Sequence, residues 1–152
     1  MYLGEILREA GLISDPQIDE LVRMNRQTGE PFGQLAQRVL GIAREDIEQA
    51  WAAYMSSLLV PADLSEFERV EPTLLARFDP DELKTLNAVP LAIDENETLH
   101  AAIGPGQVRS AMVYFWRNWM GRMRFYLANP RQISSLLGRI GSGGGRSAVG
   151  LS

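Results

Sequence analysis

Few residues in this sequence could do catalytic chemistry. It contains no cysteine, and its single histidine, His100, lies on a predicted strand with no nucleophile or metal partner near it in the sequence. The acidic cluster over 79–82 fits the capping of a helix start, and Asp94 with Glu95 fits an exposed turn. We therefore expect no enzyme, no catalytic residue and no metal site, and we interpret His100 as a packing or surface residue.

The glycine-rich segment 141–147 does not form a phosphate-binding P-loop. That motif needs a lysine directly after its glycines and a strand before them, and the sequence has neither. ATP hydrolysis by this chain is not expected. We interpret residues 141–152 as a flexible tail or linker.

Composition narrows the class of protein further. The chain has 152 residues, of which 45% are hydrophobic and 22% charged, as in a soluble globular protein. Its net charge of −4 and the lack of a basic stripe argue against nucleic acid as a partner. The start of the chain lacks a secretory signal, and no apolar run is long enough for direct membrane insertion. We expect a cytoplasmic protein.

The stretch 2–57 has the apolar spacing of helices, and short breaks separate them. Gly11 ends a first helix, and Ser14, Pro16 and Gln17 form a helix start with a capping box. The turn over 28–31 separates this second helix from two more, over 32–40 and 44–57. We predict four helices in this half.

These helices form an internal repeat, because the pattern that begins at Leu3 recurs from Phe32. Neither half could bury its apolar side alone, so we expect the two halves to pack together. The aligned pairs are Leu3-Gly4 with Phe32-Gly33, Leu12-Ile13 with Gly41-Ile42, Ile18 with Ile47, Val22 with Trp51, and Asn25 with Tyr54.

The second half of the chain has the sequence pattern of mixed strands and helices. Strands are predicted over 89–93 and 98–103 as a hairpin, and over 122–127 from the alternation of apolar and polar residues. Four helices are predicted: one over 72–78, one that starts at Asp79, one that follows Gly106 and ends at Met120, and one from Pro130 to about Ile140. The predicted fold class is α+β: an N-terminal four-helix bundle of two helix-turn-helix repeats, then a small three- to four-stranded sheet packed with helices. We divide the chain into 1–58, 59–140 and 141–152.

Several short motifs recur in a recognisable order. They are Leu3-Gly4-x-x-Leu7-x-x-x-Gly11-Leu12-Ile13 followed by Ile18 and Leu21-Val22, a degenerate second copy near Phe32-Gly33 and Gly41-Ile42, the hairpin Ala88 to Ile103, and Gly121 to Pro130. This order resembles the MshE N-terminal (MshEN) domain, which heads many ATPases of type II secretion and type IV pilus assembly. The resemblance covers roughly residues 2–148.

The resemblance implies a regulatory docking domain that binds a cytoplasmic domain of an inner-membrane secretion or pilus protein. As an alternative, it implies a receptor for cyclic di-GMP, a bacterial signalling dinucleotide, that controls secretion, pili or exopolysaccharide synthesis. Glycines at turns would admit the phosphates, and apolar side chains would contact the guanines. The ligand-binding residues would be Leu3, Gly4, Leu7, Arg8, Gly11, Leu12, Ile13, Ile18, Asn25, Phe32, Gly33, Gly41 and Ile42.

The sequence departs from the binding pattern of this family. A basic residue usually precedes the Leu-Gly pair, where this chain has Tyr2 and Pro31, and Asn25 stands in place of a glutamine. The second-copy glycine is displaced by one position, from Leu40 to Gly41. Nearby cations that could substitute are Arg8, Arg38 and Arg44. For Leu7, Ile18 and Leu21 we favour a packed core over a ligand groove, and for the glycines turn geometry is at least as good an interpretation as ligand approach.

A segment rich in large side chains lies near residue 115. A helix buries one face, so some of these side chains should stay exposed and mark a partner interface; packing against the sheet is the alternative. The interface candidates are Met112, Phe115, Trp116 and Trp119.

Overall fold

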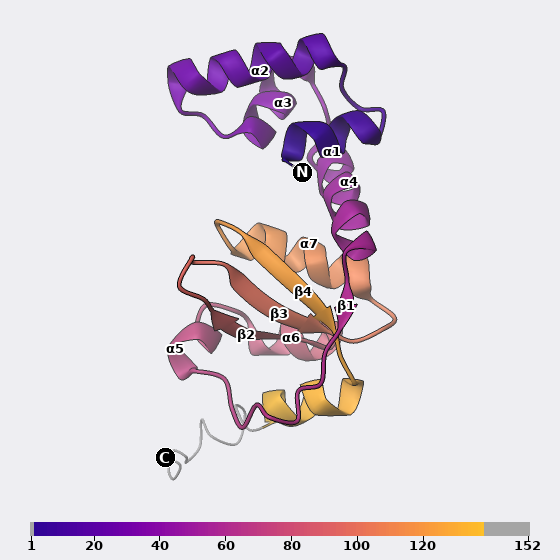
Figure 1. Cartoon of the computed structure of the whole chain (residues 1–152), viewed down its shortest axis with the longest axis vertical. Helices are drawn as coiled ribbons and strands as arrows, with labels where there is room; N and C mark the ends of the chain where they lie inside the picture. Colours follow the sequence, from indigo (N-terminus) through magenta and orange to yellow (C-terminus); the bar gives the residue numbers. More distant parts are fainter. Residues whose placement is uncertain (1, 139–152) are drawn as a thin grey trace. The chain divides into compact units, whose positions relative to one another are not determined.

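The computed structural model describes residues 2–138, and the predicted tail over 141–152 lies outside them. The chain divides into two compact units, Met1–Ser57 and Leu58–Ser152, which we call the helical unit and the sheet unit (Figure 1). The predicted α+β class, with four helices before the sheet, is confirmed.

The helical unit contains α1 (Leu3–Glu9), α2 (Asp15–Thr28), α3 (Phe32–Leu40) and α4 (Arg44–Ser57). In the alignment of the repeat, the first residues of α3 and α4 correspond to the first residues of α1 and α2, and α4 ends at the position that corresponds to the end of α2. The predicted repeat is therefore present in the structure.

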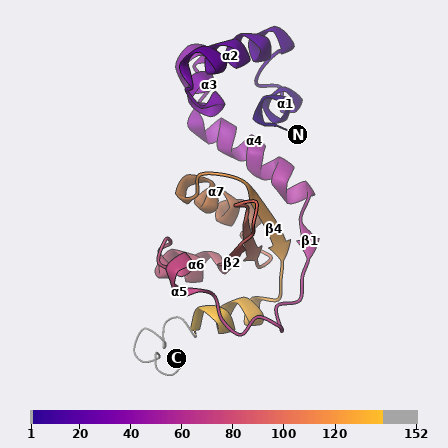
Figure 2. The ribbon, with the colours of Figure 1, turned by 60° about the vertical axis from the view of Figure 1, so that its left-hand side comes forward.

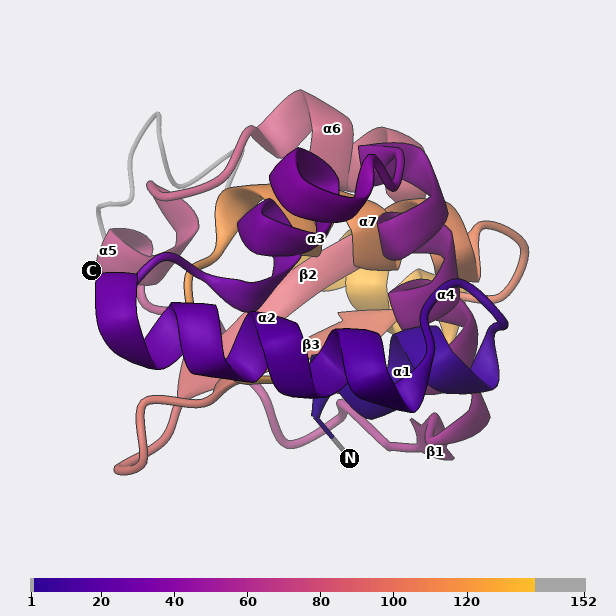
Figure 3. The ribbon, with the colours of Figure 1, turned by 90° about the horizontal axis from the view of Figure 1, so that it is seen from above.

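The two halves of the repeat are interlocked. α1 packs mainly against α4 and α3 mainly against α2, so each short helix lies on the long helix of the other half (Figure 3). The core between them comes from aligned positions, including Ile6 with Leu35 and Ile18 with Ile47, all of which are buried. Because each half completes the apolar face of the other, neither forms this core alone.

Local signals in the sequence account for the helix boundaries. Ser14 and Gln17 form the predicted capping box: the backbone N–H of each residue donates to the side chain of the other, at 2.9 Å and 3.4 Å. Gly11 and Gly41 follow α1 and α3 with φ of 77° and 70°, where a side chain would be strained. Each helix ends with a backbone hydrogen bond at the corresponding position of the repeat: Leu12 N–H donates to Leu7 O after α1, and Gly41 N–H donates to Ala36 O after α3.

The sheet unit is a mixed four-stranded sheet with helices. Its elements are β1 (Val60–Pro61), α5 (Pro72–Leu75), α6 (Pro80–Leu86), β2 (Ala88–Ile93), β3 (Leu99–Ile103), α7 (Val108–Asn118) and β4 (Met123–Leu127), and residues 130–138 are helical. The strand order is β1-β4-β3-β2, with β2 antiparallel to β3, and β3 and β1 both parallel to β4. The predicted hairpin and the predicted last strand are confirmed.

One face of the sheet is covered by helix. Phe125 on β4 lies 5.9 Å from Phe115 on α7 between ring centroids, and the residues that share its face on β3 are buried. In Figure 1, α7 passes behind β3 and β4, and within the described part of the unit no helix crosses in front of these strands. Figure 2 shows the helices α5, α6 and α7 from a second direction. The other face carries His100, Arg124 and Tyr126.

Both edges of the sheet are interrupted by proline, Pro61 in β1 and Pro90 in β2. Ala62 donates its N–H to Leu127 on β4, so the preceding position, Pro61, faces the free edge. Proline has no N–H to offer a further strand. Extension of this sheet by a partner strand is therefore disfavoured.

Candidate functional site

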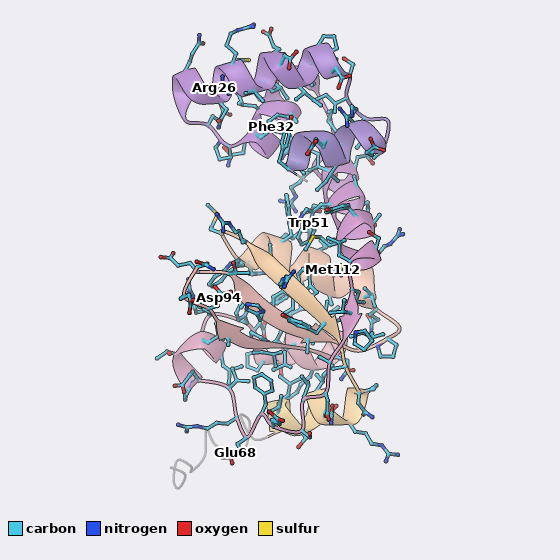
Figure 4. The ribbon with its side chains drawn as sticks, viewed as in Figure 1. Arg26, Phe32, Trp51, Glu68, Asp94 and Met112 are labelled. Carbon is cyan, nitrogen blue, oxygen red and sulfur yellow. The ribbon has the colours of Figure 1, made fainter. Side chains whose placement is uncertain are left out.

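The starts of the two repeats meet in the helical unit. A Cβ placed on Gly4 would lie 2.7 Å from Tyr2 Cε2 and 3.1 Å from Phe32 Cζ, and one on Gly33 would lie 3.5 Å from Leu3 Cδ2. Each glycine is therefore contacted by the large residue that precedes the other glycine. Phe32 lies at the start of α3 (Figure 4). Gly4 is required for close packing between α1 and α3, because a methyl group there would collide with Tyr2 and crowd Phe32, whereas the site of Gly33 has room for one.

This junction has an exposed apolar surface. Tyr2 is 51% exposed and meets Phe32 edge-on, with 6.5 Å between ring centroids. Leu3 and Phe32 are half-buried and Pro31 is exposed. We call Tyr2, Leu3, Pro31 and Phe32 the repeat-start patch. Two of its members, Tyr2 and Pro31, stand where the motif that the sequence resembles has a cation.

The other apolar ligand candidates divide between core and surface. Leu7, Ile13 and Ile18 are buried, as expected for packing, whereas Leu12 and Ile42 are half-buried after the helix ends. A Cβ on Gly11 or Gly41 would meet nothing within 4 Å, so their positive φ is a property of the turn and not of crowding.

The polar candidates have partners within the chain. Arg8 donates to Asp15 at 3.0 Å and to Glu9 at 3.4 Å, and the bond to Asp15 raises the pKa of the guanidinium above its ordinary value. Asn25 donates to the backbone oxygen of Glu30 at 2.7 Å. These contacts fasten α1 to the start of α2, and α2 to the loop that follows it.

The predicted substitute cations are also paired. Arg38 makes two hydrogen bonds to the carboxylate of Glu30, at 2.7 Å and 3.2 Å, which lowers the pKa of that carboxyl. Arg44 lies 3.4 Å from the buried carboxylate of Glu48. A phosphate in this region would have to compete with these internal carboxylates.

The expected interface near residue 115 is wrong for three of its four residues. Met112, Phe115 and Trp119 are buried: Phe115 packs between Phe78 and Phe125, and the indole N–H of Trp119 donates to Arg122 O at 3.2 Å. These side chains are buried because they lie on the side of α7 that faces the sheet, and a short helix can bury only one side. Trp116 is half-buried, and the exposed member of the segment is Met120, at 93%.

A second polar cluster, in the sheet unit, was missed by sequence reasoning. Asp94 Oδ2 lies 2.8 Å from His100 Nε2, and His100 Nδ1 lies 2.8 Å from Tyr126 Oη. The His100 bond, and then the N–H groups of Thr98 and Asn96, lower the pKa of Asp94. Part of this cluster could have been predicted. In a hairpin whose turn covers 94–98, residue 100 on the second strand lies next to the residues at the start of the turn, so His100 is near Asp94.

Metal binding has no support in the described residues. Over residues 2–138 there is no group of three or more histidine, aspartate and glutamate side chains that could hold an ion. Nor does any helix in that range have the length and apolar character needed to cross a bilayer.

Comparison with known proteins gives matches in structure only. No family model and no curated protein matches the chain. MshE with cdg matches at 19% identity and a TM-score of 0.45, over 92% of this chain and 99% of that chain. Two crystal forms of the N-terminal domain of XpsE match at 16% and 14% identity, with TM-scores of 0.45 and 0.43, over 90% of this chain and 92% and 93% of theirs. These structures are of the type that the sequence motifs predict. Matches with TM-scores below 0.5 carry no argument about the function of this chain.

Proposed function

We propose that the chain is a non-catalytic regulatory and docking domain of the kind that heads type II secretion and type IV pilus ATPases. Its partner is a cytoplasmic domain of an inner-membrane protein of such a system. The observation that carries the proposal is the repeat-start patch, an exposed apolar surface at the junction of the two repeats.

The patch has the chemistry of a protein contact. An exposed tyrosine on a rigid apolar base supplies a large contact area and loses little conformational entropy on binding. The base is rigid here because Gly4 lets the rings of Tyr2 and Phe32 approach α1 closely. Tyr2 and Pro31 are uncharged, so the patch favours an apolar protein surface over an anion.

Other features of the structure are consistent with docking. Arg8, Arg38 and Asn25 are occupied by contacts within the chain and do not converge on an open site. The proline in each edge strand disfavours partner binding by strand addition. A partner is therefore expected on the helical surface.

The test is site-specific photo-crosslinking in the cells from which the sequence comes. A photoreactive phenylalanine analogue replaces Tyr2, and the same analogue at the exposed Arg26 of α2 is the matched control. We expect the probe at Tyr2 to capture an integral inner-membrane protein of a secretion or pilus system, through its cytoplasmic part. Capture of soluble proteins alone, or equal capture from Arg26, would contradict the proposal.

Affinity measurements on the purified pair then separate the patch from the rest of the surface. Tyr2→Ser should weaken binding by about tenfold or more, since a buried aromatic anchor contributes roughly 2 kcal/mol or more to an interface. Arg26→Ser should leave it unchanged. Equal affinity of wild type and Tyr2→Ser would exclude the patch as the docking site.

A second candidate function is a receptor for cyclic di-GMP. One observation favours it: Leu3 on Gly33 and Phe32 on Gly4 are corresponding contacts in the two repeats, although the second is tighter, so the surface has an approximate two-fold repetition, as the dinucleotide has. The aromatic rings could stack on guanine. The internal pairing of Arg8 and Arg38 weighs against it.

Calorimetry distinguishes the two functions. A receptor would release saturable heat with cyclic di-GMP at roughly tens of micromolar and none with GMP. It would also show a thermal shift with the dinucleotide. Absence of both effects removes the receptor hypothesis and leaves the docking proposal as it stands.

A further inference from the structure

We propose that the open face of the sheet carries an oxyanion-binding site, formed by His100, Tyr126 and Arg124 and controlled by protonation of His100. The ligand is a carboxylate or a phosphate group. The site lies in the sheet unit and does not depend on the docking function proposed for the helical unit.

Asp94 fixes the orientation of the histidine. Its Oδ1 accepts the N–H groups of Asn96 at 2.8 Å and Thr98 at 3.0 Å, so the carboxylate cannot rotate freely and Oδ2 is directed to His100 Nε2. A carboxylate accepts and does not donate, so Nε2 carries a proton. The state of the imidazole is therefore decided at Nδ1, the atom beside Tyr126.

Protonation of Nδ1 reverses one hydrogen bond. In the neutral ring Nδ1 has a lone pair, and the Tyr126 hydroxyl must donate to it across 2.8 Å. In the protonated ring Nδ1 donates, Tyr126 Oη accepts, and the phenolic hydrogen is released to point elsewhere. The protonated face thus gains a hydrogen-bond donor together with a positive charge.

A second cation stands next to this pair. His100 and Arg124 are partners in the register between β3 and β4, and Tyr126 lies two residues further along β4, so all three share one face. Arg124 is exposed and makes no ion pair or side-chain hydrogen bond within the described residues. Its guanidinium is available for a carboxylate or phosphate.

The charges around His100 in the sheet unit are few. Asp94, labelled in Figure 4, comes from the β2–β3 turn. Tyr126 and Arg124 come from β4, and the neighbour on β2 is the uncharged Ala92. The His100 side chain is 22% exposed and that of Asp94 36%. A ligand can therefore reach the face, and the carboxylate of Asp94 is already bonded to the histidine.

The test uses the fact that the protein has one histidine. The whole chain, labelled with ¹⁵N in the imidazole, is titrated with sulfate and separately with acetate, and chloride keeps the ionic strength constant. Sulfate is a stand-in for phosphate that keeps its double charge throughout, so binding can be compared at one pH where the ¹⁵N signals show a protonated ring and at one where they show a neutral ring. The NMR signals report the proton on each ring nitrogen and the binding of the anion.

We expect saturable shifts of the His100 signals when the ring is protonated and binding at least about tenfold weaker when the ring is neutral. Tyr126→Phe keeps the ring and removes the donor, and Arg124→Gln removes the cation from an exposed position; each should weaken binding about tenfold. Arg109→Gln on α7 is the control and should change nothing. A response to sulfate alone or to acetate alone supports the site and identifies its ligand.

Three results would overturn the proposal. They are shifts no larger than with chloride, equal binding at the two pH values, and shifts that Tyr126→Phe and Arg124→Gln leave unchanged. A contact that only fastens the hairpin to β4 would give this outcome, because a structural bond requires no anion.

Discussion

Two aligned glycines should respond to the same substitution with opposite signs. Gly4 and Gly33 occupy the same position in the two repeats, each as the second residue of a short helix. In Gly4→Ala the new methyl group would meet Tyr2 at 2.7 Å and Phe32 at 3.1 Å. In Gly33→Ala it would meet Leu3 at 3.5 Å, which is an ordinary van der Waals contact.

The expected magnitudes follow from two opposing effects. Alanine in place of a helical glycine stabilises a protein by about 0.5–1 kcal/mol, because it reduces the freedom of the unfolded chain. Forcing a methyl group into a filled site costs about 1–3 kcal/mol. Gly4→Ala should therefore lower the free energy of unfolding by about 0.5–2 kcal/mol, and Gly33→Ala should raise it by about 0.5 kcal/mol, since its site has room.

Hydrogen exchange with mass spectrometry measures this change in the helical unit alone. The chain has two units, so a single unfolding curve would mix their stabilities. Peptides from α2, around the buried Leu21, report the free energy of opening of the helical core. The double variant Tyr2→Ala with Gly4→Ala should recover part of the loss, because it removes the nearer of the two crowding side chains.

The reasoning is refuted if Gly4→Ala is as stable as the wild type, or if Gly33→Ala loses as much as Gly4→Ala. Either result would mean that the rings at the junction adjust freely. The repeat-start patch would then be a mobile surface and a weaker candidate for docking.

Three further predictions concern the core, an ion pair and a helix start. Phe115→Ala should destabilise the sheet unit by about 3–5 kcal/mol, measured by hydrogen exchange of peptides from β3 and β4, whereas Met120→Ser should stay within about 0.5 kcal/mol, because the first is buried and the second is exposed. Arg38→Gln should destabilise the helical unit slightly at neutral pH. Arg38 lowers the pKa of Glu30 in the folded state. The difference in stability between wild type and Arg38→Gln should therefore persist above the pH range in which carboxyl groups usually titrate, and it should vanish as acid protonates Glu30. Ser14→Ala should cost about 1 kcal/mol in the helical unit, measured by hydrogen exchange of peptides from α2, through loss of the cap on α2.

Local features of the fold could be predicted from the sequence because their causes are local. The start of α2 depends on Ser14 and Gln17, which lie within one helical turn, and the end of α1 on Gly11. Hydrogen bonds between near neighbours satisfy these helix ends, so a short stretch of sequence contains all the information. The internal repeat was visible for the same reason, since it is a repetition of local signals.

The direction of the side chains on α7 could not be predicted. Met112, Phe115, Trp116 and Trp119 are similar in character, and their pattern does not say which of them face the sheet. Only the packing of Phe115 against Phe78 and Phe125, from segments far away in the sequence, decides this. Burial of a side chain depends on partners that the local sequence does not contain.

The sequence by itself determined where most helices and strands lie, the repeat and the scarcity of catalytic groups, because these depend on residue type and short spacing, although the predicted helix over 72–78 is shorter in the structure, Pro72–Leu75. Only the tertiary structure decided that each short helix packs on the long helix of the other half, and that Arg8 and Arg38 are paired. It also decided that His100 lies between Asp94 and Tyr126. The physical reason is that a cap is formed by neighbours in the chain, whereas a functional surface is formed by residues that meet only after long-range packing.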